Sequence, residues 1–119
     1  MIADALRLAG AEIRLHRNYF APVARDEEWL LQVGAWGWFV LKKDAHIHRR
    51  KLELAAVRQA QVGLFVLTSG NMTGAAMAAA LVNTLAQMQH FALHHTRPFL
   101  AKVYKDGSLH EDVLPEGEE

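Results

Sequence analysis

The spacing of hydrophobic and polar positions predicts helices and strands in alternation. Predicted helices cover Ile2–Leu8, a segment from Asp26 to about Val33, Lys51–Ala60, and a long alanine-rich segment from Thr73 to about His95. Predicted strands are Ala11–Leu15, which alternates apolar and polar residues, the short apolar runs Trp38–Leu41 and Gly63–Leu67, and the closing segment Phe99–Tyr104. A turn at Asp106-Gly107 and a return over Ser108–His110 follow.

This alternation predicts an α/β domain with a mostly parallel central sheet flanked by helices. The length of 119 residues fits one domain, which we place at 1–112, with an acidic disordered tail at 113–119. Ligands of such sheets bind beyond the carboxyl ends of the strands. Polar residues follow two predicted strand ends, so we expect Asp44 and Asn71 to meet at one edge.

Charge and composition narrow the class of function. The 13 Lys and Arg residues balance the 13 Asp and Glu residues, so the net charge is 13 − 13 = 0 and a globally basic nucleic-acid binder is excluded. The lack of cysteine excludes disulfides, thiolate metal sites and a catalytic thiol. No signal pattern or apolar run of roughly 18 residues occurs, so we expect a cytoplasmic protein without a membrane partner.

Asp44 is the first candidate for chemistry. A carboxylate at the end of a buried strand is a rigid oxygen ligand for a hard cation such as Mg²⁺ or Mn²⁺. It needs acidic companions, and Asp26, Glu27 and Glu28 form the only dense acidic cluster outside the tail. The alternative is that Asp26 caps a helix, that Glu27 and Glu28 are solvated, and that Asp44 is a turn residue.

The second candidate is a basic stretch between positions 42 and 51. Two histidines and five cations surround Asp44 there: Lys42, Lys43, His46, His48, Arg49, Arg50 and Lys51. Such a stretch suits a phosphate backbone, and a guanidinium can bind a phosphate through two hydrogen bonds. The alternative is a solvated surface loop.

Other motifs give weaker signals. Thr68-Ser69-Gly70-Asn71 precedes a helix and favours anions, although Asn71 or Thr73 could be a plain N-cap, and no P-loop is present. His90 and His94 lie four apart but lack the metalloprotease pattern, so they and the later histidines are interpreted as polar surface. The tryptophans are interpreted as packing residues rather than as platforms on which bases stack.

Four stretches together resemble the PIN-like domains of VapC-type toxins. They are Asp26-Glu27-Glu28-Trp29-Leu30, the run Gly37–Asp44, the run Phe65–Gly74, and Arg97–Tyr104 followed by Asp106-Gly107-Ser108. The likeness covers most of the chain, from about Ala5 to Leu109.

The resemblance implies a three-layer PIN-like fold and a metal-dependent ribonuclease, usually a toxin neutralised by an antitoxin. Asp26 or Glu27 matches the acidic residue that opens the family's second helix, and Asp44 matches the one after the following strand. Asn71 falls where the family has a polar residue lining the site. Arg49, Arg50 and Glu53 match a basic-then-acidic stretch, with Lys51 where proline is expected.

The chain departs from the family at its start. Family members begin with a strand ending in an aspartate, usually central in the sheet, whereas this chain begins in the first helix, and Asp4 on that helix does not match. Either the true start lies upstream or the chain is an N-terminally shortened relative, and the sequence leaves open whether such a relative is active. Losing a central strand would also expose unpaired backbone.

The resulting hypothesis is phosphodiester hydrolysis of RNA. Asp26, Glu27 and Asp44 are the expected catalytic residues, with Asp26 and Asp44 ligating Mg²⁺ or Mn²⁺. RNA would be bound by Lys43, Arg49, Arg50 and Asn71. The alternatives are an inactive, degenerate PIN-like module that binds RNA or a protein partner, and a structural homodimer joined by the alanine-rich helix, whose alanines equally suit packing on the sheet.

Overall fold

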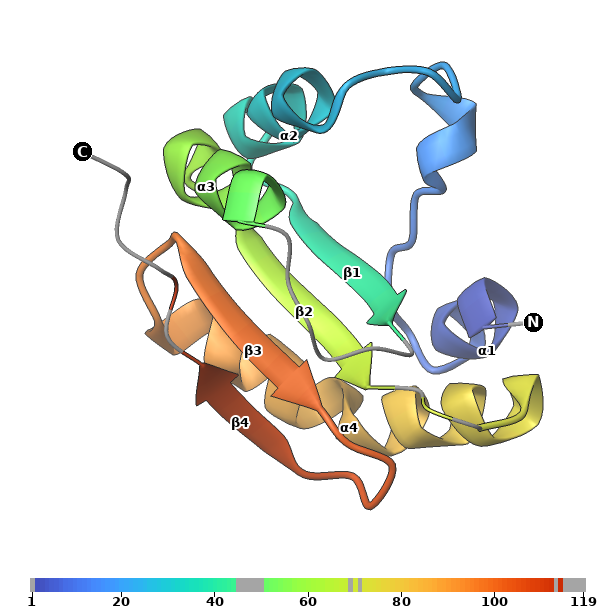
Figure 1. Ribbon diagram of the computed structural model, residues 1–119. Helices are drawn as coiled ribbons and strands as arrows, with labels where there is room; N and C mark the ends of the chain where they lie inside the picture. The colour runs from blue at the N-terminus through green and yellow to red at the C-terminus, as the bar shows by residue number, and fades with distance from the viewer. Residues whose placement is uncertain (1, 45–50, 69, 71, 113, 115–119) are drawn as a thin grey trace.

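The computed structural model describes residues 2–44, 51–68, 70, 72–112 and 114, with the backbone alone for residues 44 and 51–53. The helices are α1 (Ile2–Leu8), the short 3-10 helix η1 (His16–Asn18), α2 (Asp26–Ala35), α3 (Lys51–Ala60) and α4 (Gly74–His94). The strands are β1 (Phe39–Asp44), β2 (Gly63–Thr68), β3 (Phe99–Val103) and β4 (Leu109–Asp112). Figure 1 shows their arrangement.

The four strands form one sheet in the order β1-β2-β3-β4. Strands β1 and β2 pair in parallel, β2 and β3 pair in parallel, and β3 and β4 pair antiparallel. The antiparallel pair follows a turn in which Asp106 Oδ1 accepts hydrogen bonds from the Ser108 amide at 2.9 Å and the Ser108 hydroxyl at 2.6 Å. The predicted mostly parallel sheet and its closing turn are therefore confirmed.

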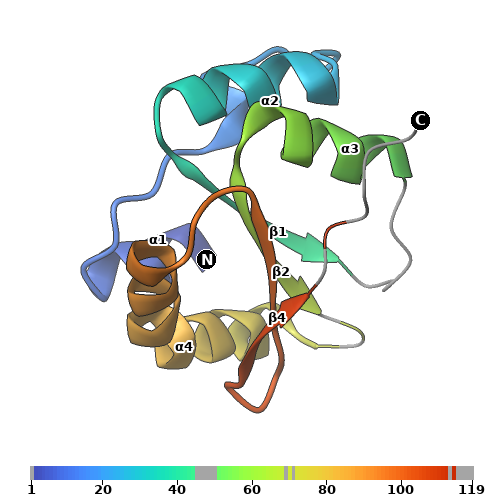
Figure 2. The ribbon, with the colours of Figure 1, turned by 90° about the vertical axis from the view of Figure 1, so that its left-hand side faces the viewer.

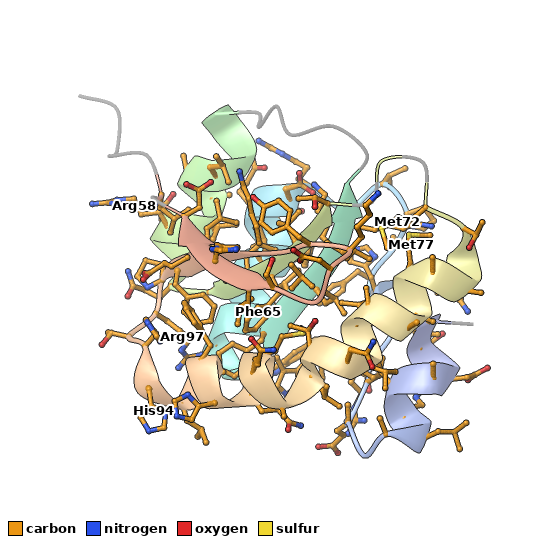
Figure 3. All side chains as sticks on the ribbon, turned by 90° about the horizontal axis from the view of Figure 1, so that it is seen from below. Arg58, Phe65, Met72, Met77, His94 and Arg97 are labelled. Carbon is orange, nitrogen blue, oxygen red and sulfur yellow. The ribbon has the colours of Figure 1, made fainter. Side chains whose placement is uncertain are left out.

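Two hydrophobic cores lie on opposite faces of the sheet, so the domain has three layers (Figures 1 and 2). Leu64 and Val66 of β2 pack with residues of α2 and α3 in one core. Phe65 and Leu67 of β2 pack with residues of α1 and α4 in the other. Phe65 and Met77 of this second core are labelled in Figure 3. Because side chains alternate along a strand, one short apolar run supplies both cores.

The alanine-rich helix α4 packs on the sheet and on α1, as its small residues allow. Ala78 and Ala80 are buried in this packing, and the hydroxyl of buried Thr84 donates a hydrogen bond to the Ala80 carbonyl at 2.7 Å. This is the use of the alanines that the sequence favoured over a homodimer contact. None of the described helices has the length and apolar character needed to cross a membrane.

Two sequence predictions about strands are wrong. Residues 11–15 form no strand, although Ala11 and Ile13 pack against the α1–α4 core, so their alternation reflects one-sided burial without a hydrogen-bonded neighbour. Strand β1 does not stop at Leu41 but continues through Lys42-Lys43-Asp44. Pairing with β2 holds these polar residues in the sheet, because backbone hydrogen bonds do not depend on side-chain polarity.

The first element of the described chain is helix α1. Each described strand is hydrogen-bonded to the next in chain order. The sheet is therefore continuous, and no gap separates neighbouring strands.

Gly63 fixes the start of β2 between two aromatic residues. It pairs with Phe39 of β1 and Phe99 of β3. The two phenylalanine rings stack at 6.0 Å, and a Cβ added to Gly63 would lie 2.5 Å from the Phe99 ring and 2.6 Å from the Phe39 ring. Only glycine leaves room for both rings over this backbone.

Gly34 sets the distance between α2 and α3. A Cβ at this position would overlap the carbonyl oxygen of Ala60 and would lie 3.2 Å from Cγ2 of Val62. The helix therefore approaches the end of α3 through a position without a side chain.

We expect Gly34→Ala to lower the free energy of unfolding by about 1–3 kcal/mol, because the added methyl group pushes the backbone of α2 away from the end of α3. Alanine also gains roughly 1 kcal/mol over glycine in a helix, and this gain opposes the steric loss. Chemical denaturation measures the free energy of unfolding of the variant. Gln32→Ala, at an exposed position of the same helix, is the matched control and should change stability by less than about 0.5 kcal/mol. A Gly34→Ala protein as stable as the control would contradict the close approach.

Candidate active site

Asp44 and Thr68 are the last residues of two neighbouring parallel strands. Their Cα atoms are partners in the β1–β2 register, so both strands end at one edge of the sheet. The Thr68 hydroxyl donates a hydrogen bond to the Val103 carbonyl at 3.2 Å, which joins the end of β2 to the end of β3. Lys43 lies one position before the edge, opposite Leu67, and is exposed. The carboxyl edge predicted for ligand binding therefore exists, with Asp44 on it.

The N-terminal end of α2 lies on the same side of the molecule as this edge. Helix α2 ends at Ala35 and β1 begins at Phe39, so a short connection reverses the chain. In Figure 2 the first turns of α2 and α3 and the end of β1 all lie on the right-hand side of the molecule. The topology thus directs Asp26 and Glu27 toward the side on which Asp44 lies.

Asp26 is the first residue of α2 and is not its N-cap. The N-cap is Arg25, with φ −75° and ψ 144°, and its side chain makes no capping hydrogen bond. Asp26 Oδ1 instead accepts a hydrogen bond from Trp29 Nε1 at 3.0 Å. The capping interpretation of Asp26 was wrong because the neighbouring indole offers its carboxylate a partner one turn along the helix.

Glu27 is an exposed carboxylate held in its ionised form. It forms a hydrogen-bonded ion pair with Arg25. A hydrogen bond from its own backbone amide at the helix N-terminus, and then the bond from Arg25, lower the pKa of Glu27 below its usual value. Asp26 and Glu27 thus place two acidic side chains in the first turn of α2.

The oxygen donors suit a hard cation, but the described residues do not form a complete cage for one. Within residues 2–44, 51–68, 70, 72–112 and 114, no group of three or more His, Asp and Glu side chains could hold a metal ion. The side chain of Asp44 lies outside the described part of the chain. Asp26 and Glu27 are neighbours at the start of α2, and Asp44 is the last residue of β1.

Three of the predicted RNA-binding residues, Arg49, Arg50 and Asn71, lie outside the described residues. The end of the loop before α4 is described, however. Thr73 caps that helix, with its Oγ1 accepting a hydrogen bond from the Ala76 amide at 3.1 Å. Gly70 has φ +49°, so the chain turns there through a conformation that favours glycine.

The histidines of α4 form polar surface, as predicted. His90 and His94 are exposed, and their rings stack at 4.1 Å. His94 also contacts the His90 carbonyl through Nδ1 at 2.8 Å, and it lies at the end of α4 in Figure 3. They join no metal-holding group among the described residues.

Sequence reasoning missed a group of aromatic rings around α2. Trp36 was interpreted as a packing residue, yet it is exposed, and its ring lies 6.0 Å from that of Tyr19, an exposed residue to which the sequence assigned no role. The signal that could have found them is the density of aromatic residues between positions 16 and 39, four of which fall outside the apolar positions of any predicted element.

A family model for the PIN-like domain matches residues 1–69, which is more than half of the chain. The chain belongs to the PIN-like domain family. Searches of curated proteins and of solved structures found no match. The PIN-like match runs from α1 to the end of β2, so it contains Asp26, Glu27 and Asp44 together with the basic stretch that follows β1.

The lowered pKa of Glu27 gives a prediction about pH. We expect its carboxyl to titrate below the ordinary value of 4.5, and Arg25→Ala to move the pKa upward, because the guanidinium stabilises the charged form. Because the folded-state pKa is the lower one, the stabilising contribution is present above the unfolded-state value and is lost as the pH falls through the folded-state value.

The measurement is an NMR titration of the Glu27 side-chain carboxyl. Arg14→Ala is the matched control, because the guanidinium that it removes is paired with Glu12. This variant should leave the pKa of Glu27 unchanged. An unchanged Glu27 pKa in Arg25→Ala would show that the ion pair contributes nothing.

Proposed function

We propose that this PIN-like domain is a metal-dependent ribonuclease that hydrolyses RNA phosphodiester bonds. The observation that carries the proposal is the placement of acidic residues within the family-matched segment. Asp26 and Glu27 open α2, and Asp44 ends a parallel strand on the same side of the molecule (Figure 2). This is the edge at which sheets of this kind bind ligands.

The proposed metal is Mg²⁺ or Mn²⁺, held by Asp26 and Asp44 with Glu27 beside them. Mg²⁺ is commonly bound by one or two carboxylates, several waters and the phosphate oxygens of the substrate. In such a site RNA itself would supply part of the ligand set. When bound, the metal polarises a phosphoryl oxygen and lowers the pKa of a coordinated water.

The chain's own residues provide orientation and charge. The hydrogen bond from Trp29 fixes the Asp26 carboxylate in one orientation, and the backbone amide of Glu27, followed by Arg25, lowers the pKa of the Glu27 carboxyl. Lys43 offers an exposed cation at the sheet edge, and we assign the holding of the phosphate backbone to Lys43, Arg49 and Arg50. Asn71 follows β2 and is assigned to orienting water or phosphate.

The resemblance to VapC-type toxins supports a narrower proposal within the family. The domain would be the toxin of a toxin–antitoxin pair acting in the cytoplasm, and its partners would be RNA and a cognate antitoxin protein. The stretches that support it are Asp26–Leu30, Gly37–Asp44 and Phe65–Gly74.

Asp44→Asn should abolish Mn²⁺-dependent RNA cleavage, with a loss of more than about 100-fold, since even partners of metal ligands are worth roughly 10- to 100-fold. The readout is cleavage of a labelled single-stranded RNA, with circular dichroism to verify the fold. Asp4→Asn makes the same change at an exposed carboxylate of α1 and should keep full activity. Cleavage retained in Asp44→Asn would remove Asp44 from the proposed site.

A second candidate function is a non-catalytic PIN-like module that binds RNA or a protein partner. The lack of a group of three metal-holding side chains in the described part of the chain favours it. The two candidates differ in how their stability responds to metal. The ribonuclease would be stabilised, because an ion that binds only the folded state stabilises that state, whereas the non-catalytic module would not.

For the ribonuclease we expect Mn²⁺ to raise the melting temperature, by the equivalent of about 2.7 kcal/mol at a concentration 100-fold above Kd. Asp44→Asn should lose most of this rise, because one of the two proposed ligands is gone. Differential scanning calorimetry with and without Mn²⁺ measures both. No rise in the unaltered protein, together with no cleavage at any Mn²⁺ concentration, would support the non-catalytic module.

A further inference from the structure

Six aromatic rings form a continuous surface beside α2, here called the aromatic stripe. Neighbouring ring centroids along it are 4.7 Å apart for His16 and Trp29, 6.0 Å for Phe20 and Trp29, 6.0 Å for Phe20 and Trp36, and 4.6 Å for Trp36 and Trp38. The members of the stripe are His16, Tyr19, Phe20, Trp29, Trp36 and Trp38.

The stripe lies outside the two hydrophobic cores. Tyr19 is 46% exposed and Trp36 is 43% exposed, and neither belongs to a core cluster. Trp29 alone touches the α2–α3 core, as a partly buried residue at its margin. Aromatic rings that leave so much surface in water without filling the core indicate a binding surface.

Cations border the stripe. Arg14 is paired with Glu12 at 2.8 Å and Arg25 with Glu27, whereas the described structure shows no ion pair for Arg17. The Arg14 guanidinium lies 5.8 Å from the centre of the Trp38 ring, and Arg17 is exposed on η1. Aromatic faces next to arginines are complementary to bases joined by phosphates.

The stripe begins at the proposed active site. Trp29 donates its indole hydrogen to Asp26, so one end of the stripe is bonded to a proposed metal ligand. From there the rings follow α2, whose 10 residues span roughly 15 Å, to Trp36 at its C-terminal end. A strand of RNA lying on these rings would therefore lead to Asp26.

We propose that the aromatic stripe binds single-stranded RNA, with bases stacking on Tyr19 and Trp36 and phosphates held by Arg14 and Arg17. The direction of the strand toward Asp26 rests on the proposed ribonuclease function, whereas the binding itself does not. Single-stranded RNA is the occupant because only unpaired bases can leave their neighbours and stack on a protein ring. A protein partner would also suit aromatic residues and arginines, and the experiment separates the two.

The test uses tryptophan fluorescence, because all three tryptophans of the chain belong to the stripe. The probe is a 12-nucleotide oligoadenylate, added in EDTA so that no metal-dependent cleavage occurs. We expect quenching by the single strand and much less by the same strand annealed to its complement. Trp36→Ala and Tyr19→Ala should each weaken binding on the order of 10-fold, measured by fluorescence anisotropy of a labelled oligonucleotide.

Matched controls separate stacking from folding. Trp36→Phe and Tyr19→Phe keep a ring at each position and should retain most of the affinity. Leu31→Ala, at a 53% exposed position of the same helix outside the stripe, should bind as the unaltered protein does. Arg17→Ala should weaken binding to all sequences alike and reduce its salt dependence.

The outcomes are distinct from those of the proposed function. Binding with the expected losses, in a protein that never cleaves RNA, would support the stripe and overturn the ribonuclease. Unchanged affinity in both Trp36→Ala and Tyr19→Ala, with native circular dichroism, would overturn the stripe whether or not the protein cleaves RNA. If these variants instead dissociate a homodimer seen by analytical ultracentrifugation and bind oligoadenylate normally, the surface is a protein contact and the proposal is wrong.

Discussion

Strand β2 is buried on both faces, and the rest of the domain is arranged around that constraint. Leu64 and Val66 face α2 and α3, while Phe65 and Leu67 face α1 and α4. A register slip of one residue would exchange the two sets and unpack both cores at once. Gly63 opposes such a slip. The rings of Phe39 and Phe99 on the two neighbouring strands fit only against a residue without a side chain, and a slip would place another residue between them. Pairing of the sheet and packing of both helical layers are thus set by the same few residues.

The position of the candidate active site is a consequence of that register. Since β1 and β2 are parallel and end together, Asp44 lies on the sheet edge at the level of Thr68. The short connection between α2 and β1 then directs the N-terminal turn of α2 to the same side, with Asp26 and Glu27 on it. The acidic residues are carried by regular structure, which is the kind of support that a rigid ligand set needs.

The sequence predicted the parts of this fold that depend on local pattern. Helix α4 and strand β2 were found because long periodicity and a short apolar run are strong signals, and the mostly parallel sheet flanked by helices followed from their alternation. The extension of β1 through Lys42-Lys43-Asp44 was missed, because backbone pairing with β2 overrides the polarity of the side chains. The exposure of Trp36 was missed for another reason. The sequence shows that an aromatic residue is present, but tertiary contacts decide whether its neighbours bury the ring or leave it at the surface.

The bond between Trp29 and Asp26 makes the two oxygens of one carboxylate unequal. Oδ1 accepts the indole hydrogen, yet each carboxylate oxygen has two lone pairs, so the bond leaves acceptor capacity on the group. What the bond restricts is rotation, because the Asp26 carboxylate has to keep one direction relative to the ring to maintain it. An indole one helical turn away therefore reduces the torsional freedom of an acidic side chain.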